Sequence, residues 1–195
     1  MKNISITNSS AIIAVDLQND FCPGGALPVP EGETVVPVMN LYIAKFNEIG
    51  LPVFFTKDWH PLNHVSFKTA GGIWPEHCVQ DTHGAELNPG LLIPGSAVII
   101  EKGREPDKDA YSAFHGTSLE ALLRKGNISR LFIGGLATDY CVRSTVLDAL
   151  HAGFEVIFLS NASKGVDVNP GDSERAIDEM LKAGAVSVAY DDIIW

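Results

Sequence analysis

Six short apolar runs alternate with longer amphipathic segments along the chain. The runs are rich in Val, Ile and Phe and cover residues 11–17, 52–57, 97–101, 131–136, 155–159 and 186–190. Most are too continuously apolar to leave one face in water, which is typical of strands in a buried parallel sheet. The amphipathic segments predict helices over residues 34–49, 118–125, 139–152 and 173–183, each followed directly by a glycine, the residue that favours helix ends.

This alternation of strands and helices predicts an α/β fold with three layers. We expect a mostly parallel, six-stranded, Rossmann-like sheet with helices on both faces, and one domain over residues 1–195, because no linker or repeat divides the chain. Residues 58–96 are the exception, since about 39 residues without a clear element are too many for an ordinary connection. A loop of that length indicates a functional segment.

Charge and cysteine content narrow the function classes. The 195 residues carry 24 acidic and 14 basic side chains, a net charge of −10 that disfavours nucleic-acid and anionic membrane partners. No apolar run approaches the ~18 residues of a membrane-spanning helix, and the first ten residues lack the pattern of a secretory signal. The three cysteines are an odd number and argue against a disulfide framework. We therefore expect a protein of the reducing cytoplasm.

Chemically reactive side chains follow four of the predicted strands. Asp16, Asp58 and Lys102 stand at three strand ends, and Cys141 lies just beyond the fourth, where a helix is predicted to begin. Each residue alone has an ordinary structural explanation, such as a turn former or a core side chain. In an open α/β sheet, however, ligands bind outside the carboxyl ends of the strands. We expect these four side chains to meet there.

Together these groups predict an amide-cleaving cysteine hydrolase. The helix N-terminus and a nearby Lys102 ammonium are expected to lower the pKa of the Cys141 thiol and favour the nucleophilic thiolate. Asp16, in a dry site that raises its pKa, can accept the thiol proton and return it to a leaving amine. The small residues over 137–141 would let two backbone N–H groups face a developing oxyanion.

A second group of polar residues lies in the long loop. Asp58, His60 and His77 offer one carboxylate and two imidazoles, which suit a divalent transition metal with open positions. His64 is a further candidate ligand, whereas the remaining histidines and Cys22 and Cys78 are expected to have no such role. A mixed nitrogen and oxygen site is compatible with zinc, iron or manganese.

Four motifs carry a resemblance to a known family over nearly the whole chain. They are VDLQNDF at 15–21, DWHPLNHVSF at 58–67, WPEHCVQ at 74–80 and GGLATDYCV at 134–142. The first and last resemble the isochorismatase-like superfamily of cysteine hydrolases, and the middle two resemble its nicotinamidases. Asp81 departs from the pattern, because family members often have glycine after the glutamine of the third motif.

The resemblance implies a role for each matching residue. Its implied triad is Asp16, Lys102 and Cys141, its metal ligands are Asp58, His60 and His77, and zinc is the favoured ion. It further implies a ring pocket walled by Phe21, Trp74 and Tyr111, with backbone N–H groups of Ala137 and Cys141 as oxyanion donors and a cis peptide before Ala137.

The implied reaction converts nicotinamide and water to nicotinate and ammonia through a thioester, in NAD salvage. Pyrazinamide is an expected analogue substrate, and a homo-oligomer is compatible with the sequence. In this interpretation the metal docks the pyridine nitrogen, and Cys141 attacks the carboxamide.

Three alternatives stay open at this point. In a metallohydrolase, the metal would generate the hydroxide and Cys141 would be structural, so alkylation of the thiol would leave turnover intact. A nucleotide-binding module would need a glycine-rich phosphate loop after the first strand, where the sequence has Asp16, Leu17 and Gln18 instead. A sister amidase of the same superfamily, acting on another small amide, is opposed only by the aromatic and metal-loop residues.

Overall fold

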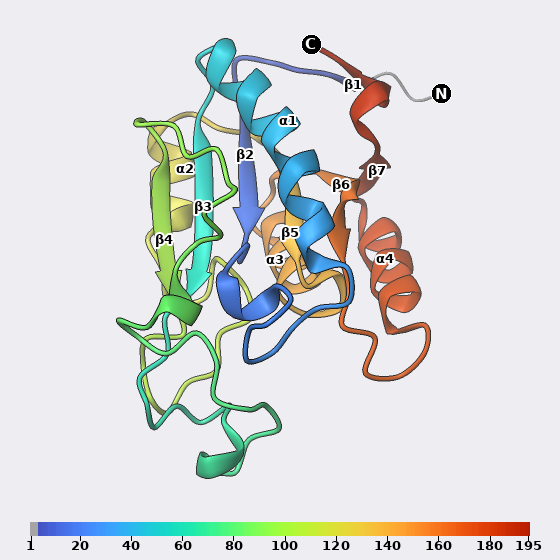
Figure 1. Cartoon of the computed structure of the whole chain (residues 1–195). Helices are drawn as coiled ribbons and strands as arrows, with labels where there is room; N and C mark the ends of the chain where they lie inside the picture. Colours follow the sequence, from blue (N-terminus) through green and yellow to red (C-terminus); the bar gives the residue numbers. More distant parts are fainter. Residues whose placement is uncertain (1–3) are drawn as a thin grey trace.

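Six parallel strands form the central sheet of the computed structural model, which describes residues 4–195 (Figure 1). Their order is β4-β3-β2-β5-β6-β7, and every neighbouring pair is parallel. The strands are β2 (Ser10–Val15), β3 (Val53–Asp58), β4 (Val98–Lys102), β5 (Arg130–Leu136), β6 (Glu155–Lys164) and β7 (Val186–Val188). This arrangement confirms the predicted α/β fold.

Helices cover both faces of the sheet. They are α1 (Val35–Glu48), α2 (Leu119–Lys125), α3 (Arg143–His151) and α4 (Asp172–Ala183). The apolar side chains of α1 pack on one face, whereas those of α2 and α3 pack on the other and α4 lies against α3. Successive side chains of β2 point to opposite faces of the sheet. Ile12 and Ala14 pack toward α1, whereas Ala11, Ile13 and Val15 pack toward α2 and α3. Burial of both faces explains the continuous apolar run.

Several elements differ from the sequence prediction. A pair of two-residue strands, β1 (Ile4–Ser5) and β8 (Ile193–Ile194), joins the two ends of the described chain and was not predicted, because two residues carry no periodicity. The sixth predicted strand ends at Val188, and a 3₁₀ helix follows over Tyr190–Asp192. β4 is an edge strand with Val98 and Ile99 exposed, so its apolar run does not signify burial. Within the described residues, no helix is both long and apolar enough to cross a membrane.

The order of the strands contains a switch point beside β2, where the chain changes direction. The chain proceeds from β2 through β3 to β4 on one side, then returns to β5 on the other side of β2. Ligands of open α/β sheets bind at such a switch point, outside the carboxyl ends of the strands. In Figure 1 the long loop between β3 and β4 extends beyond this same edge. It contains only short 3₁₀ turns, at Lys68–Ala70 and His83–Ala85.

Candidate active site

Lys102 is at the centre of a buried group of polar side chains at this edge. Its Nζ lies 2.9 Å from Asp16 Oδ2, 2.6 Å from Asp58 Oδ1 and 3.4 Å from Cys141 Sγ, and it donates a hydrogen bond to the Ala110 carbonyl at 3.2 Å. The two carboxylates raise the pKa of Lys102 well above its ordinary value despite complete burial. The structure thus brings together the residues of the expected triad, with Lys102 as the cation between them.

Asp16 is arranged as a proton acceptor. Thr56 Oγ1 donates to its Oδ1 at 2.6 Å, which leaves Oδ2 facing Lys102 and the thiol. Burial raises the pKa of Asp16, Lys102 lowers it and Asp58 raises it further, with a net increase. A carboxylate with raised proton affinity is a better general base. Its backbone φ of 48° lies in the left-handed region, which Asp adopts more readily than most residues other than glycine.

Cys141 lies in a π-helical turn, Thr138–Val142, that precedes α3. The Ala137 carbonyl accepts hydrogen bonds from the N–H groups of Tyr140 and Val142, both at 3.1 Å. The peptide bond before Ala137 is cis, as the resemblance implied. The expected lowering of the thiol pKa is wrong for this arrangement: burial raises the pKa of Cys141 well above its usual value, and Lys102 opposes this only in part. The neutral thiol therefore needs a base, and Asp16 is adjacent.

Asp58, His60 and His77 form a group that fits a metal ion. One ligand atom from each lies within 4.8 Å of the others, and all three residues are buried. His60 Nδ1 bonds the Gly103 carbonyl at 2.9 Å and His77 Nδ1 bonds the Pro75 carbonyl at 2.8 Å, which leaves both Nε2 atoms for a cation. Such carbonyl contacts orient metal-binding imidazoles in proteins. A Cβ at Gly103 would lie 2.4 Å from His60, so only glycine permits this approach.

A second set of potential ligands, Asp16, Asp58 and Cys141, is equally close together. The Lys102 ammonium lies within 3.4 Å of an atom of each. Because a positive charge already occupies the space between them, a divalent cation is disfavoured there. The described chain thus has one well-suited cation position, on the His60 and His77 side of Asp58.

His64 does not offer a ligand atom to this position. Its Nδ1 bonds Ser66 Oγ at 2.7 Å and its Nε2 bonds the Lys108 carbonyl at 3.0 Å, so both ring nitrogens are engaged. The ring stacks on His60, with centroids 4.1 Å apart. His64 therefore supports a neighbouring imidazole and ties the long loop to the segment after β4.

An apolar pocket opens beside the thiol and the metal group. Asp58, His77 and Cys141 line it, together with the three expected wall residues, Phe21, Trp74 and Tyr111, and with Ala137, the expected oxyanion donor. Trp74 Nε1 donates to Tyr111 Oη at 3.0 Å, which holds these two side chains together. A flat aromatic ligand in this pocket would have the nucleophile and the metal group within reach.

Four further pocket residues were missed at the sequence level: Leu27, Val29, Tyr140 and Val166. Tyr140 packs edge-on against Trp74, with centroids 4.9 Å apart. Tyr140 immediately precedes Cys141, a position from which it could have been found. Leu27, Val29 and Val166 are in irregular loops, where an aliphatic residue gives no periodic signal.

Two other sequence features now have a structural explanation. Gln18 bridges the ends of β2 and β3, since its amide accepts from the Asp58 N–H at 2.7 Å and donates to the Asp58 carbonyl at 2.8 Å. Asp81 has a φ of 62°, in the left-handed region that favours glycine and tolerates Asp. This accounts for the family's frequent glycine there.

All three cysteines are free and buried, in agreement with the absence of a disulfide framework.

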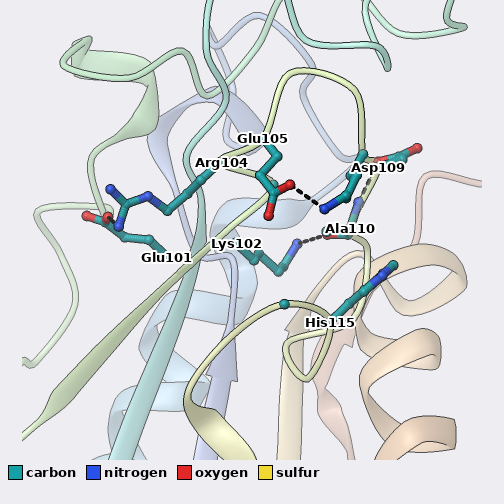
Figure 2. A pocket seen from close by; sticks show the side chains of 10 residues that line it. Glu101, Lys102, Arg104, Glu105, Asp109, Ala110 and His115 are labelled. Atoms are coloured by element: carbon teal, nitrogen blue, oxygen red, sulfur yellow. Dashed lines mark hydrogen bonds and ion pairs between the residues drawn. The ribbon is translucent and has the colours of Figure 1, made fainter.

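A second, polar hollow lies at the end of β4, and Figure 2 shows Lys102 reaching toward Ala110 at its edge. Arg104 pairs with Glu101 at 3.1 Å, and Lys108 pairs with Glu105 at 2.5 Å. The hollow is lined mainly by charged residues and glycines, so it lacks the apolar walls expected for an aromatic ligand. A flat aromatic ligand therefore fits the apolar pocket better than this hollow.

Comparison with known proteins agrees with this geometry. Residues 10–192 match the model of the isochorismatase domain. The chain belongs to the isochorismatase family. Within this family it is 44% identical to the nicotinamidase of Escherichia coli (strain K12), over 93% of this chain and 95% of that protein.

Solved structures of the isochorismatase family superpose closely on the chain. Pyrazinamidase of Pyrococcus horikoshii in complex with zinc is 53% identical, with a TM-score of 0.90 over 93% of this chain and 99% of that one. PnC1 from L. infantum in complex with nicotinate is 33% identical, with a TM-score of 0.91 over 98% of each chain. The similarity therefore includes nearly the full length of both proteins.

Proposed function

We propose that this isochorismatase-family protein is a nicotinamidase, a cysteine hydrolase that converts nicotinamide and water to nicotinate and ammonia. The observation that carries the proposal is that Asp16, Lys102 and Cys141 meet beside an aromatic pocket, next to the group of Asp58, His60 and His77. The high identity to a nicotinamidase supports the same substrate. Pyrazinamide, which keeps the ring shape and carboxamide, is the expected second substrate.

The reaction follows from the positions of the side chains. Phe21, Trp74 and Tyr111 hold the ring, and Asp16 takes the thiol proton as sulfur attacks the carboxamide carbon. The backbone N–H groups of Ala137 and Cys141 are the proposed donors to the oxyanion. Asp16 returns the proton to the nitrogen, the C–N bond breaks and ammonia leaves. Asp16 then takes a proton from a water whose oxygen attacks the thioester carbon, and it returns that proton to sulfur as the C–S bond breaks, which frees nicotinate and the thiol.

Asp58, His60 and His77 are the proposed holders of one divalent cation, with zinc favoured by the zinc complex of the Pyrococcus horikoshii relative. When bound, the cation supplies a Lewis acid that can anchor the ring nitrogen. Lys102 neutralises Asp58 and Asp16 from the other side, which keeps two carboxylates ionised in a buried site.

The test of the function is ammonia release from nicotinamide by the purified protein, with elemental analysis of the metal. We expect turnover of nicotinamide and pyrazinamide and one equivalent of zinc per chain. Turnover of an unrelated small amide, with none of nicotinamide, would favour the sister amidase. Full activity after alkylation of Cys141 would favour the metallohydrolase.

Benzamide tests the docking of the ring. It has the shape of nicotinamide without the ring nitrogen, so it presents the same carboxamide to Cys141 but loses one polar contact. We expect kcat/KM at least about 100-fold below that of nicotinamide, because a site built for a polar contact rejects an analogue that lacks it. Steady-state ammonia release on both amides measures the ratio. Equal kcat/KM values would contradict a docking role for Asp58, His60 and His77.

Replacement of Lys102 by Met tests the charge balance at the thiol. Lys102 lowers the pKa of Cys141 while burial raises it, so loss of the ammonium should raise that pKa further. The labelling rate of Cys141 with iodoacetamide should then rise only at higher pH, with its midpoint shifted upward by about one unit or more. Mass spectrometry of the labelled peptide in both proteins follows the profile. An unchanged midpoint would assign Lys102 a role away from the thiol.

A further inference from the structure

We propose that Asp20 is a positioning residue that couples the wall of the ring pocket to the metal-ligand loop. Its carboxylate is used for backbone contacts: Oδ1 accepts from the Ala26 N–H at 3.0 Å and Oδ2 accepts from the Cys78 N–H at 2.7 Å. The two carboxylate oxygens of Asp20 therefore join the segment of Ala26 to that of Cys78, which lies far from it in the sequence. The inference rests on the proposed function, because it assumes that the loop holds a metal.

The first contact shapes the pocket. Ala26 precedes Leu27, a pocket-wall residue, and the Leu27 N–H also donates to the Asp20 carbonyl at 3.0 Å. Val29, another wall residue, donates to the carbonyl of Phe21 at 3.0 Å. Leu27 and Val29 are thus held by the two-residue segment of Asp20 and Phe21.

The second contact reaches the metal ligands. Cys78 directly follows His77, and its carbonyl accepts from the His60 N–H at 3.0 Å. Cys78 has a φ of 46°, a left-handed value that costs free energy for a non-glycine residue and persists only when its surroundings hold it. The short bond from its N–H to Asp20 supplies such a restraint. Asp20 thereby positions both imidazoles of the proposed metal group through one strained peptide.

A glycine makes room for this carboxylate. A Cβ built at Gly84 would lie 2.1 Å from Asp20 Oδ2, far inside contact distance, and the φ of Gly84 is not in the left-handed region. Alanine is therefore compatible with the backbone at this position but incompatible with the carboxylate where it lies. Gly84→Ala displaces Asp20 without changing its chemistry.

Asp139 provides a matched control on the other side of the pocket. Its Oδ1 accepts from the Val166 N–H at 2.9 Å and its Oδ2 from the Asp167 N–H at 2.8 Å. Asp139 thus also holds a wall residue through two backbone bonds, but these bonds lead away from the metal loop. Asp139→Asn loses the same kind of contact as Asp20→Asn, since an amide has only one acceptor oxygen.

The experiment compares zinc release and steady-state kinetics in the zinc-loaded wild type, Asp20→Asn, Gly84→Ala and Asp139→Asn. Transfer of zinc to a chromophoric chelator should be about 10- to 100-fold faster in Asp20→Asn and Gly84→Ala, because loss of contacts that orient metal ligands weakens metal binding by about this factor. In Asp139→Asn the transfer rate should stay within about twofold of wild type. KM for nicotinamide should rise severalfold in all three variants, because each loosens a pocket wall.

The outcomes separate this inference from the function it rests on. Wild-type zinc release in Asp20→Asn, or equal acceleration in Asp139→Asn, would overturn the coupling while leaving the nicotinamidase proposal intact. A wild type that hydrolyses nicotinamide but retains no zinc would overturn both the proposed metal group and the coupling. Faster zinc release confined to Asp20→Asn and Gly84→Ala would support the coupling through Asp20.

Discussion

Cys141→Ala is expected to lower nicotinamide turnover by about 10⁴-fold or more, because nucleophiles that form covalent intermediates account for effects of this size. The substitution removes only the sulfur from a short buried side chain next to Lys102, so pocket and metal group should keep their arrangement. Ammonia release under saturating nicotinamide measures the loss. Retained turnover would contradict the thioester mechanism.

The same variant separates attack from docking. The aldehyde analogue of nicotinamide has no amine to expel, so the thiolate adduct would stop as a thiohemiacetal that resembles the tetrahedral state. We expect reversible inhibition of the wild type and weaker aldehyde binding to Cys141→Ala, with zinc content unchanged in both. Equal affinity in the two proteins would show that the aldehyde does not react with Cys141.

Asp16→Asn is expected to lower turnover by about 10²- to 10⁴-fold, the range for loss of a general base. The amide keeps the size of the carboxylate but can neither take the thiol proton nor return it to ammonia. Burial is the largest cause that raises the pKa of Cys141 and it remains in this variant, although the smaller raising effect of the Asp16 charge is lost. Turnover close to wild type would exclude Asp16 as the base.

The pH dependence of this variant provides a second measurement. If Asp16 is the base, the residual rate of Asp16→Asn should increase with pH, because only free thiolate can then react. The wild-type rate should depend on the protonation of Asp16 instead, and fall only at low pH, where Asp16 becomes protonated. Since burial raises the pKa of Asp16, this fall should begin above the pH at which an ordinary carboxylate protonates. Parallel profiles for the two proteins would contradict the assignment.

The sequence by itself determined the sheet and the residues at its carboxyl edge. The apolar runs of β2, β3 and β5 are buried on both faces, and such continuous runs are typical of a parallel sheet covered on both faces. Asp16, Asp58 and Lys102 end or follow strands, and the carboxyl ends of parallel strands share an edge. Their meeting with Cys141 was therefore predictable from connectivity and residue type.

Only the tertiary structure decided what surrounds these residues. The pKa of Cys141 was predicted too low, because the sequence shows the nearby lysine but not the complete desolvation that opposes it. Both ring nitrogens of His64 are engaged, by Ser66 and by the Lys108 carbonyl, and these bonds depend on how two loops pack. Leu27 and Val166 also reach the pocket only through the packing of loops. Irregular loops have no hydrophobic period, so their contacts exist only once the whole chain has folded.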